Sequence, residues 1–301
     1  MKKILSILFI AILFVGCKKD LLNTAPYSSI ASETMWTSDN LTDLGVAGVY
    51  AALRLGIVSG GASGLELYQL DSYGFTGQSS DNLPLIAGTM TTTAGLFAST
   101  WQNMYEGIQR ANDAITNIPK KSPSNAEKKA RYLAEVKFLR AYYYFRLNQV
   151  YKGVPIYLEP FTADEAKKPR NTEQEVWNLI IADLTDCINE SNLPDRYEAG
   201  NALYGHVSKG AAYALRGKAY LYQEKWALAA SDFSKVKDAG YALYPNYTAL
   251  FKTANEQSPE MIFSLQNIGQ TGFGSTTQFY CGTRSSFGSC WNTYHVSPNL
   301  V

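Results

Sequence analysis

Apolar residues recur at helical spacing along most of the chain, so the pattern predicts a mainly α-helical protein. We expect Asn40 and Asn171 to cap two of the helices and Pro119 to end another. Residues 260–266 alternate between apolar and polar side chains and predict a short strand. The predicted helices cover residues 41–55, 96–118, 127–150, 172–188, 203–222 and 225–237.

Two long stretches, residues 56–95 and 268–301, lose this periodicity and are rich in Gly, Ser and Thr. Long irregular segments are uncommon in compact domains and usually carry function. We therefore expect the binding chemistry of the protein to lie in these two loops. Residues 18–40 are polar and aperiodic and predict a tether.

The helical pair over residues 203–237 has the residue spacing of a tetratricopeptide repeat. The small Gly217 allows the second helix to approach, and Tyr220 and Phe233 fill the seam. Arg216 stands where that repeat prefers Leu. An internal echo supports the repeat: LRAxxY at 139–144 matches LRGxxY at 215–220. We expect about three such pairs to stack into a curved scaffold, since one pair cannot bury its apolar face alone.

The N-terminus is built like an export signal. Met1-Lys2-Lys3 is positively charged, residues 4–15 are almost wholly apolar, and Gly16-Cys17 follows. The apolar run is too short for a membrane-spanning helix and suits the core of a signal peptide. The Gly-Cys junction resembles the bacterial lipobox, which implies removal of residues 1–16 and acylation of Cys17. The alternative is an ordinary secretory signal with an incidental cysteine.

Charge and cysteine content narrow the function classes. The chain carries 27 basic and 26 acidic residues, and a net charge of +1 is too small to indicate a nucleic-acid partner. Cys187 lies among apolar residues and is predicted to be buried. Cys281 and Cys290 either form a disulfide or stay free. We expect no metal site and no cofactor, because His295 is the sole nearby histidine and no CxxC motif occurs.

Several motifs, in order along nearly the whole chain, resemble the SusD/RagB family of Bacteroidetes surface lipoproteins. They are CKKDLL at 17–22, LGVAGVYAAL at 44–53, YEGIQRAN at 105–112, AEVKFLRAYYYF at 134–145, GVP at 153–155, the helical pair, and EMIFS at 260–264.

The resemblance implies a protein held in the outer membrane by its lipid and exposed at the cell surface. It implies capture of an oligosaccharide or other nutrient and delivery to a TonB-dependent, SusC-like transporter. It also implies a tetratricopeptide scaffold on one side and irregular loops as the ligand face. Family members are longer, so we expect a domain over residues 41–301 that lacks its C-terminal part.

The two loops combine aromatic rings with polar groups, as recognition of a sugar requires, because a sugar ring has a C–H face and a hydroxyl edge. The alternative is that these aromatic side chains fold back onto the helices. The candidate ligand-binding residues are Asp71, Tyr73, Phe75, Asp81 and Asn82 in the first loop and Tyr280, Arg284, Trp291 and Tyr294 in the second.

Catalysis is not expected. Asp71 and Asp81 could be proposed as a glycosidase pair, but so could any two acidic residues in loops. His206 and His295 do not support a Ser-His-Asp triad, and His206 is predicted to be a surface or packing residue. A different function class stays open, namely a scaffold that binds peptides or proteins in its tetratricopeptide groove.

Overall fold

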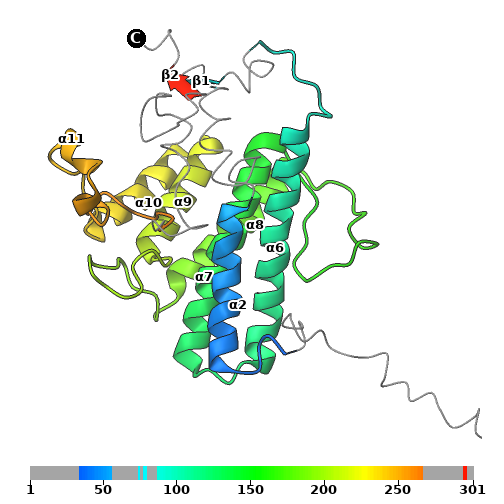
Figure 1. The fold of residues 1–301 in the computed structure, drawn as a ribbon, viewed down its shortest axis with the longest axis horizontal. Coiled ribbons are helices and arrows are strands. Elements are labelled where there is room, and N and C mark those ends of the chain that lie inside the picture. The colour runs from blue at the N-terminus through cyan, green and yellow to red at the C-terminus, as the bar shows by residue number, and fades with distance from the viewer. Residues whose placement is uncertain (1–33, 56–73, 75–76, 80–86, 267–293, 297–301) are drawn as a thin grey trace, which may run out of the picture.

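Helices dominate the computed structural model, which describes residues 34–55, 74, 77–79, 87–266 and 294–296 (Figure 1). Short 3-10 helices follow α2 at Ala52–Arg54 and α11 at Thr253–Asn255. The α-helices are α2 (Asp39–Ala51), α6 (Gly95–Lys121), α7 (Ala126–Tyr151), α8 (Glu173–Asn189), α9 (Lys209–Tyr222), α10 (Trp226–Asp238) and α11 (Tyr247–Leu250).

The helices from α6 to α10 form a stack in which each one packs against the next, and α2 lies against α6 and α7 (Figure 1). This is the expected scaffold of tetratricopeptide-like pairs. Its centre is α7, which buries residues around its whole circumference because α2, α6 and α8 cover it. Tyr143, Tyr144 and Phe145 are each at most 1% exposed.

A buried ion pair joins the two helices of the first pair, α7 and α8. Arg140 donates two parallel hydrogen bonds to Asp183, each 2.8 Å long. A third nitrogen of Arg140 donates to the Asn112 side chain on the preceding helix, α6, at 2.9 Å. The charged side chains are 7% and 5% exposed, so the pair holds three helices together from inside the core.

The second pair, α9 and α10, repeats this arrangement. Arg216 donates two 2.8 Å hydrogen bonds to Asp232, and a third nitrogen donates to Thr185 of the preceding helix, α8, at 2.9 Å. The second helices of the two pairs also match in sequence, with WNLIIAD at 177–183 and WALAASD at 226–232. Arg216 is therefore part of the repeat in this chain, although it departs from the usual tetratricopeptide pattern.

Two of the predicted helix caps are wrong by one or two residues. The hydroxyl of Ser38, and not the side chain of Asn40, accepts from the backbone at the start of α2. Thr172 caps α8 in a reciprocal arrangement with Glu175. Asn171 is used elsewhere, because its side-chain oxygen accepts from the backbone nitrogen of Ile156 at 3.0 Å. A tertiary contact thus occupies Asn171, while the cap of α8 is formed locally by Thr172 and Glu175.

Other boundaries also differ from the pattern. Pro119 lies inside the last turn of α6, which continues to Lys121. Proline costs one hydrogen bond there and does not stop the last residues from keeping helical geometry. The predicted helix from 203 starts only at Lys209, where Ser208 caps it.

The predicted strand over residues 260–266 is wrong. The chain there is irregular, and what lies beside it is a helix: the Phe263 ring packs edge-on against Phe138 of α7, 5.1 Å between centroids. The described strands lie elsewhere, at Gly77–Ser79 (β1) and Tyr294–Val296 (β2), and pair with each other in antiparallel register. Ile262, Phe263 and Leu265 of this segment pack against the helical core.

Two further residues, Trp36 and Cys187, are buried in the core. Trp36, which the pattern placed in the tether, is 2% exposed, and its indole nitrogen donates to Asp113 of α6 at 2.9 Å. The prediction that Cys187 is buried is confirmed, and burial raises the pKa of its thiol. The thiol therefore stays protonated and behaves as a small apolar side chain.

Close contact between α6 and α7 makes Gly107 a sharp probe of the packing. A Cβ atom at Gly107 would lie 2.7 Å from the ring of Tyr143, which is fully buried and donates to the backbone of Val49. We predict that Gly107→Ala lowers the free energy of unfolding by about 1–3 kcal/mol.

Gly48 of α2 is the matched control, since nothing lies within 4 Å of its Cβ position. Gly48→Ala should be neutral or stabilising by up to about 1 kcal/mol, because alanine favours a helix. Urea denaturation measures both variants. Equal stability of the two would contradict the packing between α6 and α7.

The Arg140–Asp183 pair allows a second test. Asp183→Ala leaves a buried guanidinium without its carboxylate, which we expect to cost about 3–5 kcal/mol of unfolding free energy. Asp186, one turn along α8, pairs with Lys137 at the surface and is 56% exposed, so Asp186→Ala should cost at most about 1 kcal/mol. Denaturant unfolding that ranks the two variants the other way would refute the role given to the buried pair.

Candidate ligand-binding site

The two strands join the two predicted binding loops. Backbone pairing sets Gly77 opposite Val296 and Ser79 opposite Tyr294, so a segment of the first loop lies beside the end of the second. Of the candidate residues, Tyr294 lies in β2, where its backbone is described. The others lie outside the described residues: Asp71, Tyr73, Phe75, Asp81, Asn82, Tyr280, Arg284 and Trp291, as do Cys17, Cys281 and Cys290.

A cavity of about 270 Å³, which we call the rim cavity, lies where the chain enters both loops. Leu53 and Arg54, just before the first loop, form one part of its wall. Leu265 and Gln266, just before the second loop, form another. The segments that carry the candidate residues therefore leave the helical scaffold at a single place.

One buried carboxylate fixes the wall of the rim cavity. The side chain of Glu135 on α7 is fully buried, and its Oε2 atom accepts from the Tyr50 hydroxyl at 2.7 Å. His206 Nδ1 lies 2.8 Å from the same oxygen. The other oxygen, Oε1, is 3.6 Å from a guanidinium nitrogen of Arg131. Glu135 thereby ties α2 and the turn before α9 to α7.

Tyr50 holds the turn from a second side. The backbone nitrogen of Val207 donates to the Tyr50 hydroxyl at 2.9 Å. Burial, followed by the charge of Glu135, raises the pKa of Tyr50 well above its usual value. The phenol therefore stays neutral and keeps donating to the carboxylate. The rings of Tyr50 and His206 lie 5.2 Å apart and present a tilted aromatic pair to the cavity.

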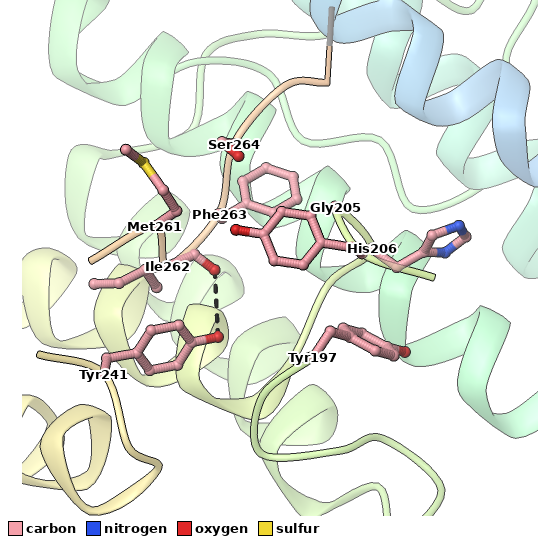
Figure 2. Close-up of a pocket in the computed structure, with 9 residues that line it drawn as sticks. Tyr197, Gly205, His206, Tyr241, Met261, Ile262, Phe263 and Ser264 are labelled. Atoms are coloured by element: carbon pink, nitrogen blue, oxygen red, sulfur yellow. Dashed lines mark hydrogen bonds between the residues drawn. The ribbon is translucent and has the colours of Figure 1, made fainter. Parts of the chain in front are cut away.

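A smaller void adjoins the rim cavity, and Figure 2 shows the side chains around it. His206 and Phe263 line both spaces, while Tyr241 closes the far side by donating to the carbonyl of Ile262 at 3.4 Å. The void has a volume of about 10 Å³, which is close to what a single water molecule needs. It separates the rim cavity from a third cavity beyond it.

The rim cavity offers aromatic faces beside hydroxyl, imidazole and guanidinium groups, a mixture suited to a ligand that is apolar on its faces and polar at its edges. The described residues hold no cluster of three or more His, Cys, Asp or Glu side chains that could bind a metal ion.

Sequence reasoning missed Glu135 and Tyr50 as wall-forming residues and gave His206 a surface or packing role. One signal was available, since Glu135 is a carboxylate between the buried residues Ala134 and Val136 of the strongest helix. A charge in such a place needs a partner. Arg131, one turn earlier on α7, is a charged partner that the spacing offers. The hydrogen-bonding partners Tyr50 and His206, more than 70 residues away, were not readable from the pattern.

A sequence model of the SusD-like family, described as "Starch-binding associating with outer membrane", matches residues 22–221. The chain belongs to the SusD-like family. The resemblance found in the sequence motifs is thereby confirmed, and so is the mainly helical, tetratricopeptide-like fold.

Two SusD-like relatives come from Formosa agariphila. SusD-like protein P38 is 27% identical over 320 residues, covering 99% of this chain and 60% of the relative. SusD-like protein P25 is 23% identical over 312 residues, covering 99% of this chain and 58% of the relative. This SusD-like chain thus spans about 60% of the length of each of these relatives.

Solved SusD-like structures share the fold. A SusD-like protein from Bacteroides fragilis superposes with a TM-score of 0.72 at 22% identity, over 91% of this chain and 54% of that one. A laminarin-binding SusD-like protein gives a TM-score of 0.72 at 27% identity, over 88% of this chain and 63% of that one. Within the described residues, no helix is both long and apolar enough to span a bilayer.

Proposed function

We propose that this SusD-like chain is a glycan-binding lipoprotein of the outer membrane. It captures an oligosaccharide at the face formed by its two aromatic loops and passes it to a TonB-dependent, SusC-like transporter. The observation that carries the proposal is the pairing of β1 with β2. The two strands lie more than 200 residues apart in the sequence, in stretches that are both rich in aromatic and polar side chains, and they pair with each other.

The chemistry of the loops supports a sugar as the ligand. The rings of Tyr73, Tyr280 and Trp291 offer flat apolar surface to the C–H face of a pyranose. The side chains of Asp81 and Arg284 supply an acceptor and donors for its hydroxyl edge. The remaining candidates, Asp71, Phe75, Asn82 and Tyr294, add groups of the same two kinds.

The relatives support the same class of ligand. One solved relative is a laminarin-binding SusD-like protein, and another, from Bacteroides thetaiotaomicron, is a surface glycan-binding protein. The family is described as starch-binding and associated with the outer membrane. Laminari- and malto-oligosaccharides are therefore the first probes for this chain. The proposed role is binding without catalysis.

Trp291 is the residue on which we test the ligand face. An indole has the largest flat apolar surface of any side chain, so Trp291→Ala should weaken oligosaccharide binding by about 1–3 kcal/mol, as for other stacking platforms. The melting temperature should change little. Quenching of tryptophan fluorescence by laminari- or malto-oligosaccharides should be lost in this variant, and calorimetric titration gives the affinity.

Trp226 is the matched control, because it is a tryptophan on α10 that is 60% exposed and belongs to the helical scaffold. Trp226→Ala should keep the affinity of the parent. The glycan-binding proposal fails if Trp291→Ala binds every oligosaccharide as the parent does, or if the protein binds extended peptides and no glycan. The second result would favour the peptide-binding scaffold.

The membrane anchor is tested at Cys17. Changing Cys17 to Ala removes the proposed site of acylation, so the protein should incorporate no labelled fatty acid and should be released from membranes. Cys187→Ala is the control, since Cys187 is a buried core residue and its loss should leave labelling intact. A Cys17→Ala variant that still sediments with the outer membrane would refute the lipid attachment site.

A further inference from the structure

A third cavity, of about 170 Å³, lies on the other side of Tyr204 from the rim cavity. We call it the Tyr204 recess. It is formed by the segment that precedes α9, with Arg196, Tyr197 and Glu198, and by the segment around Ser258. Tyr204 is the one lining residue that it shares with the rim cavity. The recess is therefore a separate space.

Unpartnered polar atoms gather at this recess. Six buried side-chain nitrogen or oxygen atoms in the described residues lack a hydrogen-bond partner. Four of them belong to residues that line the recess: Arg196 Nε, Ser258 Oγ and the hydroxyls of Tyr197 and Tyr204. The Tyr197 hydroxyl interacts with Arg131, which leaves the other three for a ligand. Buried polar groups in folded proteins are nearly always paired, so such a concentration calls for a bound partner.

The charge of the recess limits what that partner is. Arg196 forms an ion pair with Glu198, and another of its nitrogens donates to the backbone of Gly240 at 2.6 Å. The pair leaves no net charge to attract an anion or a cation. What remains is one N–H donor and two hydroxyls, which both donate and accept. This set suits a neutral ligand that carries hydroxyl groups.

The volume and the lining of the recess narrow the class of ligand further. The recess is far larger than the neighbouring void of about 10 Å³, which holds one water molecule at most. It is smaller than the cavities of roughly 300–1,000 Å³ that take drug-sized ligands. Aromatic side chains of Tyr197, Tyr204 and Tyr241 form part of its wall. A single saturated ring with hydroxyl groups meets all of these conditions.

We propose that the Tyr204 recess binds one neutral, polyhydroxylated ring of monosaccharide size, at a site separate from the two loops. The ring's hydroxyl groups accept from Arg196 Nε and exchange hydrogen bonds with Tyr204 and Ser258. The inference goes beyond the proposed function, because it places a second binding site in the scaffold itself. The residues that form this site are distinct from Trp291 and the other candidate residues of the loops.

The test uses glucose, galactose, mannose and xylose as neutral probes and glucuronate as the charged comparison, with binding followed by saturation-transfer NMR. At least one neutral sugar should bind, and more tightly than glucuronate. Tyr204→Phe and Ser258→Ala should each weaken that binding about fivefold, the effect of losing one hydrogen bond. Neither should lower the melting temperature, because the deleted hydroxyl groups have no partner in the protein.

Two controls separate this site from the loops and from a general effect. Tyr247→Phe removes a hydroxyl from a tyrosine that is 78% exposed on α11, so it should bind the sugar as the parent does. Trp291→Ala should also keep monosaccharide binding, whatever happens to oligosaccharide binding. In protein labelled with ¹⁵N-arginine, the Nε–H signal of Arg196, assigned with Arg196→Lys, should shift when the sugar is added.

Four results would overturn the proposal. The first is that none of the neutral sugars binds. The second is that Tyr204→Phe and Ser258→Ala bind the sugar as the parent does. The third is that the Arg196 signal does not move at saturating sugar. The fourth is loss of monosaccharide binding in Trp291→Ala, which would place the sugar in the loops.

Discussion

The scaffold depends on a buried arginine that holds three helices. Arg140 donates two hydrogen bonds to Asp183 and one to Asn112, so a single guanidinium links α6, α7 and α8. Asn112 in turn donates to the backbone of Tyr157 at 2.9 Å, which fixes the connection between α7 and α8. A buried ion pair is costly to form and costlier to break, so it specifies one arrangement of these helices.

The arginine–aspartate arrangement recurs in the second helical pair, but the tryptophan of that pair is less buried. Trp177 on α8 is 3% exposed, and its ring lies near Tyr222 of α9, 6.0 Å between centroids. Its counterpart on α10, Trp226, is 60% exposed in the described structure. The arginine–aspartate geometry is therefore a property of each helical pair, whereas burial of the repeat tryptophan depends on whether another helix packs against it.

The carboxylate of Glu135 links the helical scaffold to the rim cavity. It lies one turn before Leu139 and Arg140 on α7, and it anchors Tyr50 and His206, which line the rim cavity. The cavity wall is thus set by the same helix that carries the buried ion pair. A rigid scaffold beneath irregular loops suits recognition, because the loops vary in chemistry while their starting points stay fixed.

The sequence by itself determined the helices, the pairing of α9 with α10 and the family, because apolar spacing and local motifs lie within short segments. Gly217 shows this, since its Cβ position faces Phe233 at 2.7 Å, as the repeat predicts. Tertiary structure alone decided the hydrogen bonds of Glu135 to Tyr50 and His206 and the irregular path of residues 260–266. Each depends on which distant groups come within hydrogen-bonding or packing distance. The sequence proposed two binding loops, and only the pairing of β1 with β2, made by backbone atoms that leave no side-chain pattern, brought them together.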